Sequence, residues 1–155
     1  MKSAEVAFRW IVGILKNHKI PFQIAGGLAA RMYGSRRELY DIDLDVPEES
    51  IEKILPEIHP YIIHGPTQYK DDHWDLLLLT LSYEEQRIDI SGANNAKKFD
   101  ENSQTWISAR ADLGASQIME IYGMQVPVIP KATLIAYKKK LSRGVDIDDL
   151  KYLTN

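Results

Sequence analysis

Three aspartates alternate with branched aliphatic residues in one short stretch of the 155-residue chain, DIDLDV at residues 41–46. An alternation of polar and apolar residues with a period of two predicts a β-strand. Asp41, Asp43 and Asp45 would then share one face, and the aliphatic side chains the other. Neighbouring carboxylates on such a face lie roughly 7 Å apart, and at an effective dielectric constant of about 20 their repulsion is on the order of 2 kcal/mol. A cationic partner is therefore expected against this face.

A glycine pair, Gly26-Gly27, stands between the apolar run IPFQIAG at residues 20–26 and a run of helix-forming residues that ends at Gly34. Glycine lets the backbone approach a ligand closely, and the first turn of a following helix offers unpaired N–H groups to an anion. Taken alone, such a pair marks a tight turn more often than a phosphate site. The chain contains neither GxGxxG nor GxxxxGK[ST], so it has no Rossmann or P-loop fingerprint.

The two stretches together resemble a known signature. Gly26-Gly27 is followed after thirteen residues by DIDL, which begins at Asp41, and the later segment QRIDIS supplies Asp89 between two isoleucines. A glycine pair, a spacer, an alternating quartet of acids and hydrophobic residues and a third acid on a later strand resemble the DNA polymerase β-type nucleotidyltransferase superfamily.

The closing segment LIAYKKKLSRGVDIDDL adds to this resemblance. It is similar to the C-terminal helices of small bacterial members, which include lincosamide and aminoglycoside nucleotidyltransferases and abortive-infection toxins. The matching positions are Lys138, Arg143, Asp146 and Asp149, and the whole resemblance spans residues 24 to about 150. Between Arg143 and Asp149 we expect a structural ion pair.

The resemblance implies a fold, an activity and a set of site residues. The fold would be α+β, a small twisted mixed sheet flanked by helices. The activity would be metal-dependent transfer of a nucleoside monophosphate from a nucleoside triphosphate to an acceptor hydroxyl, with release of pyrophosphate. Asp41, Asp43 and Asp89 would be catalytic and would bind Mg²⁺, a cation that prefers a few carboxylates together with substrate phosphates. The nucleotide-binding residues would be Gly26, Gly27, Ser35, Arg36, Arg37 and Lys138.

Asp45 leaves an alternative open. The metal pair can be Asp41 and Asp43, which the spacing of the signature favours, or Asp43 and Asp45. Asp45 also stands three residues before Glu48, a pattern typical of a capping box at the start of the next helix. We prefer the first pair, with Asp45 as a capping residue.

Ordinary ion pairing is the alternative for the other charged residues. Asp89 stands two residues after Arg87, and Lys138 lies in a KKK run that is typical of a solvated helix face. Helical spacing nevertheless places Lys138 on the apolar side of its helix. We therefore expect its ammonium group to reach the cleft edge and meet the metal-site carboxylates in the free protein, while Lys139 and Lys140 lie in solvent.

Composition limits the remaining possibilities. The chain has no cysteine, which excludes disulfides and cysteine-ligated zinc, and its formal net charge of −3 argues against a generic polyanion binder. Charged residues interrupt the apolar N-terminal stretch, unlike a signal peptide. No apolar run reaches the eighteen or so residues of a membrane span. We therefore expect a cytoplasmic protein.

Hydrophobic periodicity predicts the order of the elements. Residues 1–155 are expected to form one nucleotidyltransferase domain, with a helical extension over 130–155. Helices are predicted over 3–18, 27–34 and 47–58, strands over 20–26 and 41–46, an antiparallel pair in HWDLLLLTL and QRIDIS, and a hairpin in ASQIMEI and MQVPVI. Residues 92–112 show no pattern, and acceptor specificity is expected there.

The acceptor itself is not readable from the sequence. A small molecule is the first expectation, and a toxin-type enzyme acting on tRNA or a protein side chain is an alternative. A catalytically quiet module that serves as an antitoxin or regulatory partner is another, although none of the three expected acids is missing.

Overall fold

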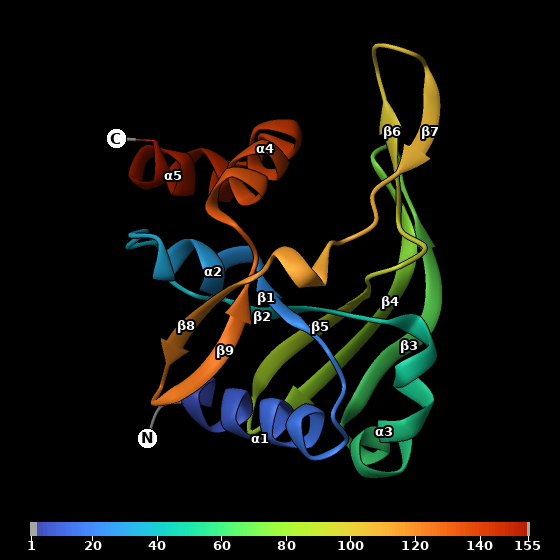
Figure 1. Cartoon of the computed structure of the whole chain (residues 1–155), viewed down its shortest axis with the longest axis vertical. Coiled ribbons are helices and arrows are strands. Elements are labelled where there is room, and N and C mark those ends of the chain that lie inside the picture. The colour runs from blue at the N-terminus through green and yellow to red at the C-terminus, as the bar shows by residue number, and fades with distance from the viewer. Residues whose placement is uncertain (1–2, 155) are drawn as a thin grey trace.

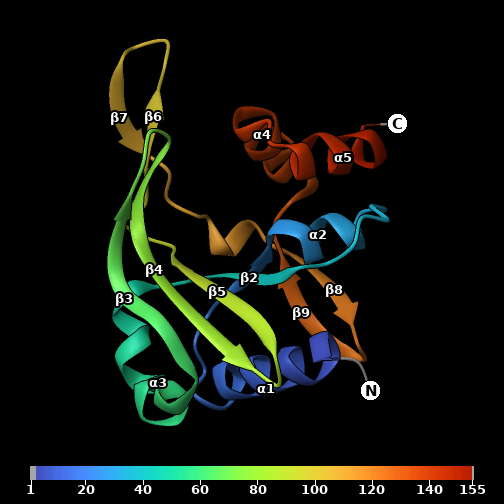
Figure 2. The same cartoon turned by 180° about the vertical axis from the view of Figure 1, so that it is seen from behind.

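A computed structural model describes residues 3–154 of the chain, and Figures 1 and 2 show it from opposite sides. Its helices are α1 (Ser3–Asn17), α2 (Gly26–Met32), α3 (Ile51–Ile58), α4 (Lys131–Leu141) and α5 (Gly144–Leu153), with short 3-10 helices η1 (Glu48–Ser50), η2 (His59–Tyr61) and η3 (Leu113–Ala115). Its strands are β1 (Gln23–Ala25), β2 (Asp41–Val46), β3 (Ile62–Lys70), β4 (Trp74–Tyr83), β5 (Gln86–Gly92), β6 (Lys97–Asp100), β7 (Thr105–Ser108), β8 (Gln117–Ile121) and β9 (Met124–Val128).

The strands form one mixed sheet in the order β7-β6-β4-β5-β2-β1-β9-β8, with β3 paired to β4 outside that path. The strand β2 lies between β1, to which it is antiparallel, and β5, to which it is parallel. Both views show α1 and α3 below the sheet, and α2, α4 and α5 above it. The predicted α+β class is confirmed.

Burial along β2 follows the predicted alternation. Ile42, Leu44 and Val46 are at most 1% exposed, whereas the three aspartates between them are half-buried. The aliphatic side chains join one hydrophobic core with residues of α1, among them Phe8, Ile11 and Leu15. This core fixes which way β2 faces, because a shift of one residue would turn every aspartate into it.

Residues 92–112, unassigned from their pattern, contain the hairpin of β6 and β7, which projects beyond the end of β4 (Figure 1). The backbone N–H groups of Asn94 and Asn95 both donate to the carboxylate of Glu48, at 2.8 Å. Glu48 therefore anchors a distant loop, and the capping box expected between Asp45 and Glu48 is wrong.

The other predicted elements are confirmed to within a few residues, including the β4–β5 pair, the β8–β9 hairpin and the two closing helices. Between residues 3 and 154, no helix combines the length and the hydrophobicity that a bilayer crossing requires.

Candidate active site

The strands β2 and β5 bring the three predicted acids together. Asp43 lies directly opposite Asp89 in the parallel β2–β5 pair, and Asp89 lies opposite Thr80 in the antiparallel β5–β4 pair. Residues paired in this way point to the same side of a sheet, and so does Asp41, two residues before Asp43. The acids therefore lie on adjacent strands, as predicted. We call the side of the sheet that carries Asp41, Asp43 and Asp89 the acidic face.

Burial and repulsion between acids raise the pKa values of two aspartates on the acidic face. Burial, followed by the charges of Asp89, Asp41 and Asp45, raises the pKa of Asp43 to about 7, although the ammonium group of Lys138 acts in the opposite direction. Burial and the charge of Asp89 also raise the pKa of Asp41. Burial and neighbouring acids therefore oppose the ionisation of Asp43 and Asp41, in line with the repulsion expected from the spacing of the aspartates.

Arg87 supplies part of the missing charge. Its Nε lies 3.1 Å from Oδ2 of Asp89 and 3.9 Å from Oδ1 of Asp41, so the guanidinium group spans the two carboxylates. The hydroxyl of Thr80 donates to Oδ1 of Asp89 at 2.7 Å. The ion pair between Asp89 and Arg87, which the sequence left open as an alternative, is therefore present in the structure.

The donor chemistry of the acidic face fits a hard divalent cation, because carboxylate oxygens are ligands that Mg²⁺ prefers. Within residues 3–154, no three acidic or histidine side chains are arranged to hold one ion. The side chain of Arg87 is 52% exposed. It can therefore swing into solvent and leave Asp41 and Asp89 to a cation.

Asp45 belongs to a separate polar network. Its Oδ2 accepts a 2.7 Å hydrogen bond from Nε2 of Gln23, whose Oε1 accepts one of 3.0 Å from Ser116. Burial raises the pKa of Asp45 to about 6, although the bond from Gln23 opposes that shift. Asp45 is therefore held by Gln23, and the assignment of Asp41 and Asp43 as the metal pair stays a prediction.

The glycine pair lies against the acidic face. Gly26 has φ +58°, a left-handed conformation, and a Cβ at this position would overlap the carboxylate of Asp43. A Cβ at Gly27 would come within 2.6 Å of Nη2 of Arg37. Gly26 therefore requires glycine, which allows α2 to begin directly beside Asp43, whereas a side chain at Gly27 would have to displace the end of Arg37.

Lys138 is buried, as its helical position predicted, with 2% of its surface exposed. Its Nζ lies 2.8 Å from Oδ2 of Asp149 and 3.2 Å from Oδ1 of Asp146. The expectation that it meets the metal-site carboxylates in the free protein is therefore wrong, because α5 supplies two closer anions. Lys140 is not free in solvent either, since its Nζ donates to the backbone carbonyl of Phe99.

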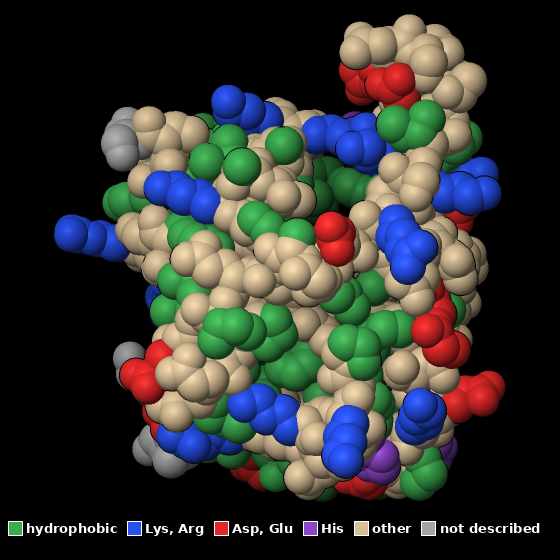
Figure 3. Space-filling view, viewed as in Figure 1, with side chains coloured by type: hydrophobic (Ala, Val, Ile, Leu, Met, Phe, Trp, Pro, Cys, Tyr) green, Lys and Arg blue, Asp and Glu red, His purple; other side chains and the backbone are tan. Residues whose placement is uncertain are grey.

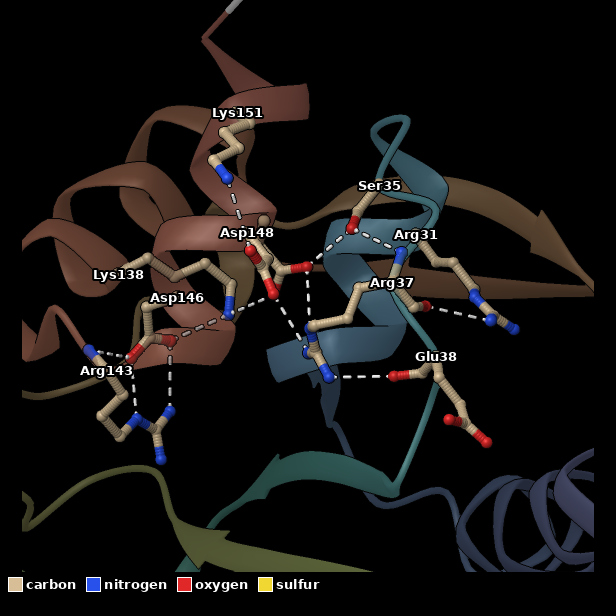
Figure 4. Close-up of polar contacts among 10 residues, drawn as sticks. Arg31, Ser35, Arg37, Glu38, Lys138, Arg143, Asp146, Asp148 and Lys151 are labelled. Carbon is tan, nitrogen blue, oxygen red and sulfur yellow. Dashed lines mark hydrogen bonds and ion pairs between the residues drawn. The ribbon is translucent and has the colours of Figure 1, made fainter.

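Figure 4 shows how α4 and α5 are fastened to the loop after α2. Asp149 accepts hydrogen bonds from Oγ of Ser35 at 2.6 Å and from Nε and Nη2 of Arg37, each at 3.0 Å. Arg143 pairs with Asp146, at 2.7 Å, so the ion pair expected between Arg143 and Asp149 is wrong. We call Ser35, Arg37, Lys138, Asp146 and Asp149 the helix clip.

Both aspartates of the helix clip are fully buried, yet both are held ionised. Burial alone would raise the pKa of Asp149, but hydrogen bonds from Arg37, Lys138 and Ser35 outweigh it and lower that pKa. The pKa of Asp146 is lowered in the same way, with Arg143 as the strongest opposing partner. Arg36, the remaining predicted nucleotide contact, is exposed.

Thr80, Gln23 and Ser116 are not predicted as site residues from the sequence. Thr80 and Gln23 are lone polar residues in the apolar runs LLLLTL and IPFQIA, a signal of a buried polar contact. Ser116 carries no such signal, because its partner is 93 positions away in the chain.

Comparison with solved structures identifies the fold. A candidate nucleotidyltransferase from Thermotoga maritima aligns over 94% of this chain and 88% of its own, with a TM-score of 0.76 and 23% sequence identity. The chain has the nucleotidyltransferase fold. The lincosamide adenylyltransferase LnuA, bound to lincomycin, shares the fold over 100% of this chain and 98% of its own, with a TM-score of 0.64 and 15% identity.

A third nucleotidyltransferase-fold structure, ANT(2'')-Ia in complex with adenylyl-2''-tobramycin, aligns over 91% of this chain and 78% of its own, with a TM-score of 0.61 and 18% identity. Comparison of the sequence with family models and with curated proteins finds no match. The likeness is therefore one of structure, and residue roles must be argued from this chain.

Asp43→Asn is expected to stabilise the metal-free protein at pH 8 and not at pH 4. A folded-state pKa raised to about 7 means that stability falls as pH rises from about 4 through 7, because ionisation is opposed only in the folded state. A shift of about three units corresponds to at most about 4 kcal/mol. Urea unfolding in EDTA at both pH values measures the difference, with the exposed Asp148→Asn as control. Equal effects at both pH values would contradict the electrostatic explanation.

Lys138→Met is expected to destabilise the fold by about 3–5 kcal/mol, because it leaves two buried carboxylates without their shared cation. Lys139→Met changes an exposed neighbour in the same helix and is expected to change stability by less than about 0.5 kcal/mol. Urea unfolding at pH 7 compares the two variants. A loss below about 1 kcal/mol for Lys138→Met would show that the helix clip is not a stabilising network.

Proposed function

We propose that this protein is a Mg²⁺-dependent nucleotidyltransferase that moves a nucleoside monophosphate from a nucleoside triphosphate to a hydroxyl group of a small molecule. The observation that carries the proposal is the direct opposition of Asp43 and Asp89 across β2 and β5, with Asp41 beside them, in a nucleotidyltransferase fold. The lincomycin-bound and adenylyl-tobramycin-bound neighbours support a small-molecule acceptor.

Asp41, Asp43 and Asp89 would hold the magnesium. When bound, Mg²⁺ supplies the charge that the acidic face lacks and stabilises the negative charge that builds up on the phosphates. Arg87 would leave its position between Asp41 and Asp89 as the ion arrives. Its guanidinium group would then be free to pair with a phosphate oxygen.

The triphosphate would lie at the start of α2. A Cβ at Gly26 would overlap the carboxylate of Asp43, and one at Gly27 would come within 2.6 Å of Nη2 of Arg37, so a phosphate at this turn would lie beside both an acid of the metal site and a guanidinium group. Arg37 lies against Gly27 and is oriented by Asp149, and Arg36 is exposed to solvent. The direct contact of Lys138 with the triphosphate remains a prediction, and its contacts in the free protein give it a positioning role within the helix clip.

The reaction is an in-line displacement at the α-phosphorus. The acceptor oxygen forms the new P–O bond, the bond to the bridging oxygen of the β-phosphate breaks, and pyrophosphate leaves with the electron pair. The carboxylate of Asp89, once released by Arg87, accepts the proton of the acceptor hydroxyl. Thr80 orients that carboxylate through its 2.7 Å hydrogen bond.

A catalytically quiet binding module is not favoured, because all three acids are present on one side of two adjacent strands. The formal net charge of −3 weighs against tRNA as the acceptor. Incubation with each labelled triphosphate and Mg²⁺, followed by pools of small hydroxylated acceptors, tests the proposal directly. Absence of triphosphate turnover with every acceptor pool would contradict it.

Asp43→Asn and Asp89→Asn are each expected to lower Mg²⁺-dependent triphosphate turnover by at least about 100-fold, because both remove a carboxylate from the metal site and Asp89 also accepts the proton. Release of pyrophosphate measures turnover, and circular dichroism checks the fold. Asp45→Asn is the matched control on the same strand and should retain most of the activity. Loss of activity in Asp45→Asn, with activity retained in Asp41→Asn, would move the metal pair to Asp43 and Asp45.

Gly27→Val is expected to weaken triphosphate binding by at least about tenfold, since a branched side chain would block approach to the N–H groups and displace Arg37. Calorimetry with a non-hydrolysable triphosphate and Mg²⁺ measures the affinity. Gly13→Val, at a helical glycine with open space around it, is the control. Unchanged affinity in Gly27→Val would place the phosphate site elsewhere.

A further inference from the structure

An apolar strip on β4 continues the acidic face away from the glycine turn. Thr80 lies opposite Asp89 in the β4–β5 pair. Because side chains alternate along a strand, Leu78, Leu76 and Trp74 point to the same side as Thr80. These three large hydrophobic residues are only half-buried, whereas Leu79 and Leu81, on the other side of the strand, are fully buried. We call Trp74, Leu76 and Leu78 the β4 strip.

Tyr137 of α4 covers one end of the β4 strip. Its ring centroid lies 5.3 Å from that of Trp74, with the two planes inclined by 36°. Burial and the charge of Asp43 raise the pKa of the Tyr137 hydroxyl, so this side chain lies close to both the strip and the acidic face.

Trp74 carries an unsatisfied donor. Among the side-chain nitrogen and oxygen atoms of residues 3–154, Nε1 of Trp74 is the one that is buried and has no hydrogen-bond partner. An unpaired buried N–H group is costly, and it identifies a place where a ligand can supply the missing acceptor. A small rotation of Trp74 or Tyr137 would expose this group to a bound molecule, since neither side chain is fully buried.

The order of the strands indicates which substrate the β4 strip would face. The glycine turn follows β1, the acids lie on β2 and β5, and the strip lies on β4, so the acids stand between the turn and the strip. In an in-line displacement the attacking oxygen and the leaving pyrophosphate are on opposite sides of the phosphorus. With the triphosphate at the glycine turn, the acceptor must approach from the side of β4.

Charge around the β4 strip narrows the class of acceptor. Lys98 lies opposite Trp74 across β4 and β6, and Lys140 reaches across from α4 to the carbonyl of Phe99. Arg143 is near enough to Tyr137 to influence its pKa. Figure 3 shows a recess between α4 and the β6–β7 hairpin with hydrophobic side chains inside and basic side chains at its rim. Such a rim repels cationic groups on the part of a ligand that lies over the β4 strip.

We propose that the β4 strip and Tyr137 form the acceptor subsite, which binds a neutral, hydroxylated ring compound with one apolar face. The ring packs on Trp74, Leu76 and Leu78, and a ring oxygen or hydroxyl accepts a hydrogen bond from Nε1 of Trp74. This inference rests on the proposed nucleotidyl transfer for its identification of the ligand as the acceptor.

The test uses Trp74 as its own reporter. Trp10→Phe and Trp106→Phe in one chain leave Trp74 as the sole tryptophan of the three. Titration with phenyl β-D-glucopyranoside, a neutral ring alcohol, is expected to give a saturable change in tryptophan emission without any nucleotide present. 2-Deoxystreptamine, a hydroxylated dication, is expected to give none at the same concentrations. No saturable change with the glucoside, or a larger change with the dication, would overturn the proposal.

Two further measurements test whether the β4 strip binds the acceptor or the nucleobase, and which part of Trp74 contacts the ligand. ATP with Mg²⁺ should leave the emission of Trp74 largely unchanged, and a saturable quench by ATP larger than that by the glucoside would show that the strip holds the nucleobase instead. Trp74→Leu should weaken glucoside binding at least tenfold by ligand-observed NMR, and Trp74→Phe, which keeps a ring but loses the N–H group, should lie between Trp74→Leu and the unmodified chain. Equal binding by all three chains would overturn the subsite.

Triphosphate affinity, measured by calorimetry, distinguishes failure of the subsite from failure of the proposed function. Trp74→Leu should bind ATP and Mg²⁺ as the unmodified chain does. If the unmodified chain binds ATP but the glucoside leaves Trp74 unaffected, the subsite is wrong and the proposed function stands. If the glucoside binds at Trp74 but the unmodified chain binds no triphosphate, the proposed function is wrong, and with it the identification of the ligand as an acceptor.

Discussion

Repulsion between the carboxylates of Asp43 and Asp89 is the constraint around which the rest of the site is arranged. The parallel pairing of β2 and β5 places the two acids side by side, and burial raises the pKa of Asp43 to about 7. A sheet would not keep such an arrangement for stability alone, because ionising a half-buried acid beside two others opposes folding. Arg87 only partly relieves it. We propose that a divalent cation, which arrives with the triphosphate, supplies the remaining positive charge.

The helix clip holds α4 and α5 above the acidic face. Lys138 satisfies two buried aspartates of α5, and Asp149 in turn orients Arg37 beside the glycine turn. A buried network of this kind is stable only when every member is paired. One set of contacts thus fixes the helices and sets the direction of an arginine at the proposed triphosphate site.

Period and motif order were enough to predict β2, β5 and the acids they carry, because a strand with one buried face allows only one orientation of its alternating residues. They were not enough for contacts between distant segments. The partner of Glu48 is a loop more than forty residues away, and Arg143 pairs within its own helix cap and not with Asp149. The β4 strip was not predictable either, because WDLLLLTL is a largely apolar run with no alternation. Only its pairing with β5 shows which of its residues lie on the side of the acids.

Binding of Mn²⁺, followed by electron paramagnetic resonance in the presence of α,β-methylene-ATP, tests the central claim most directly. We expect the unmodified chain to bind about two ions when the analogue is present. Replacing Asp43 and Asp89 together by asparagine should abolish this binding while the chain stays folded. Mn²⁺ bound equally by the unmodified and doubly substituted chains would contradict the assignment of the acidic face as the metal site.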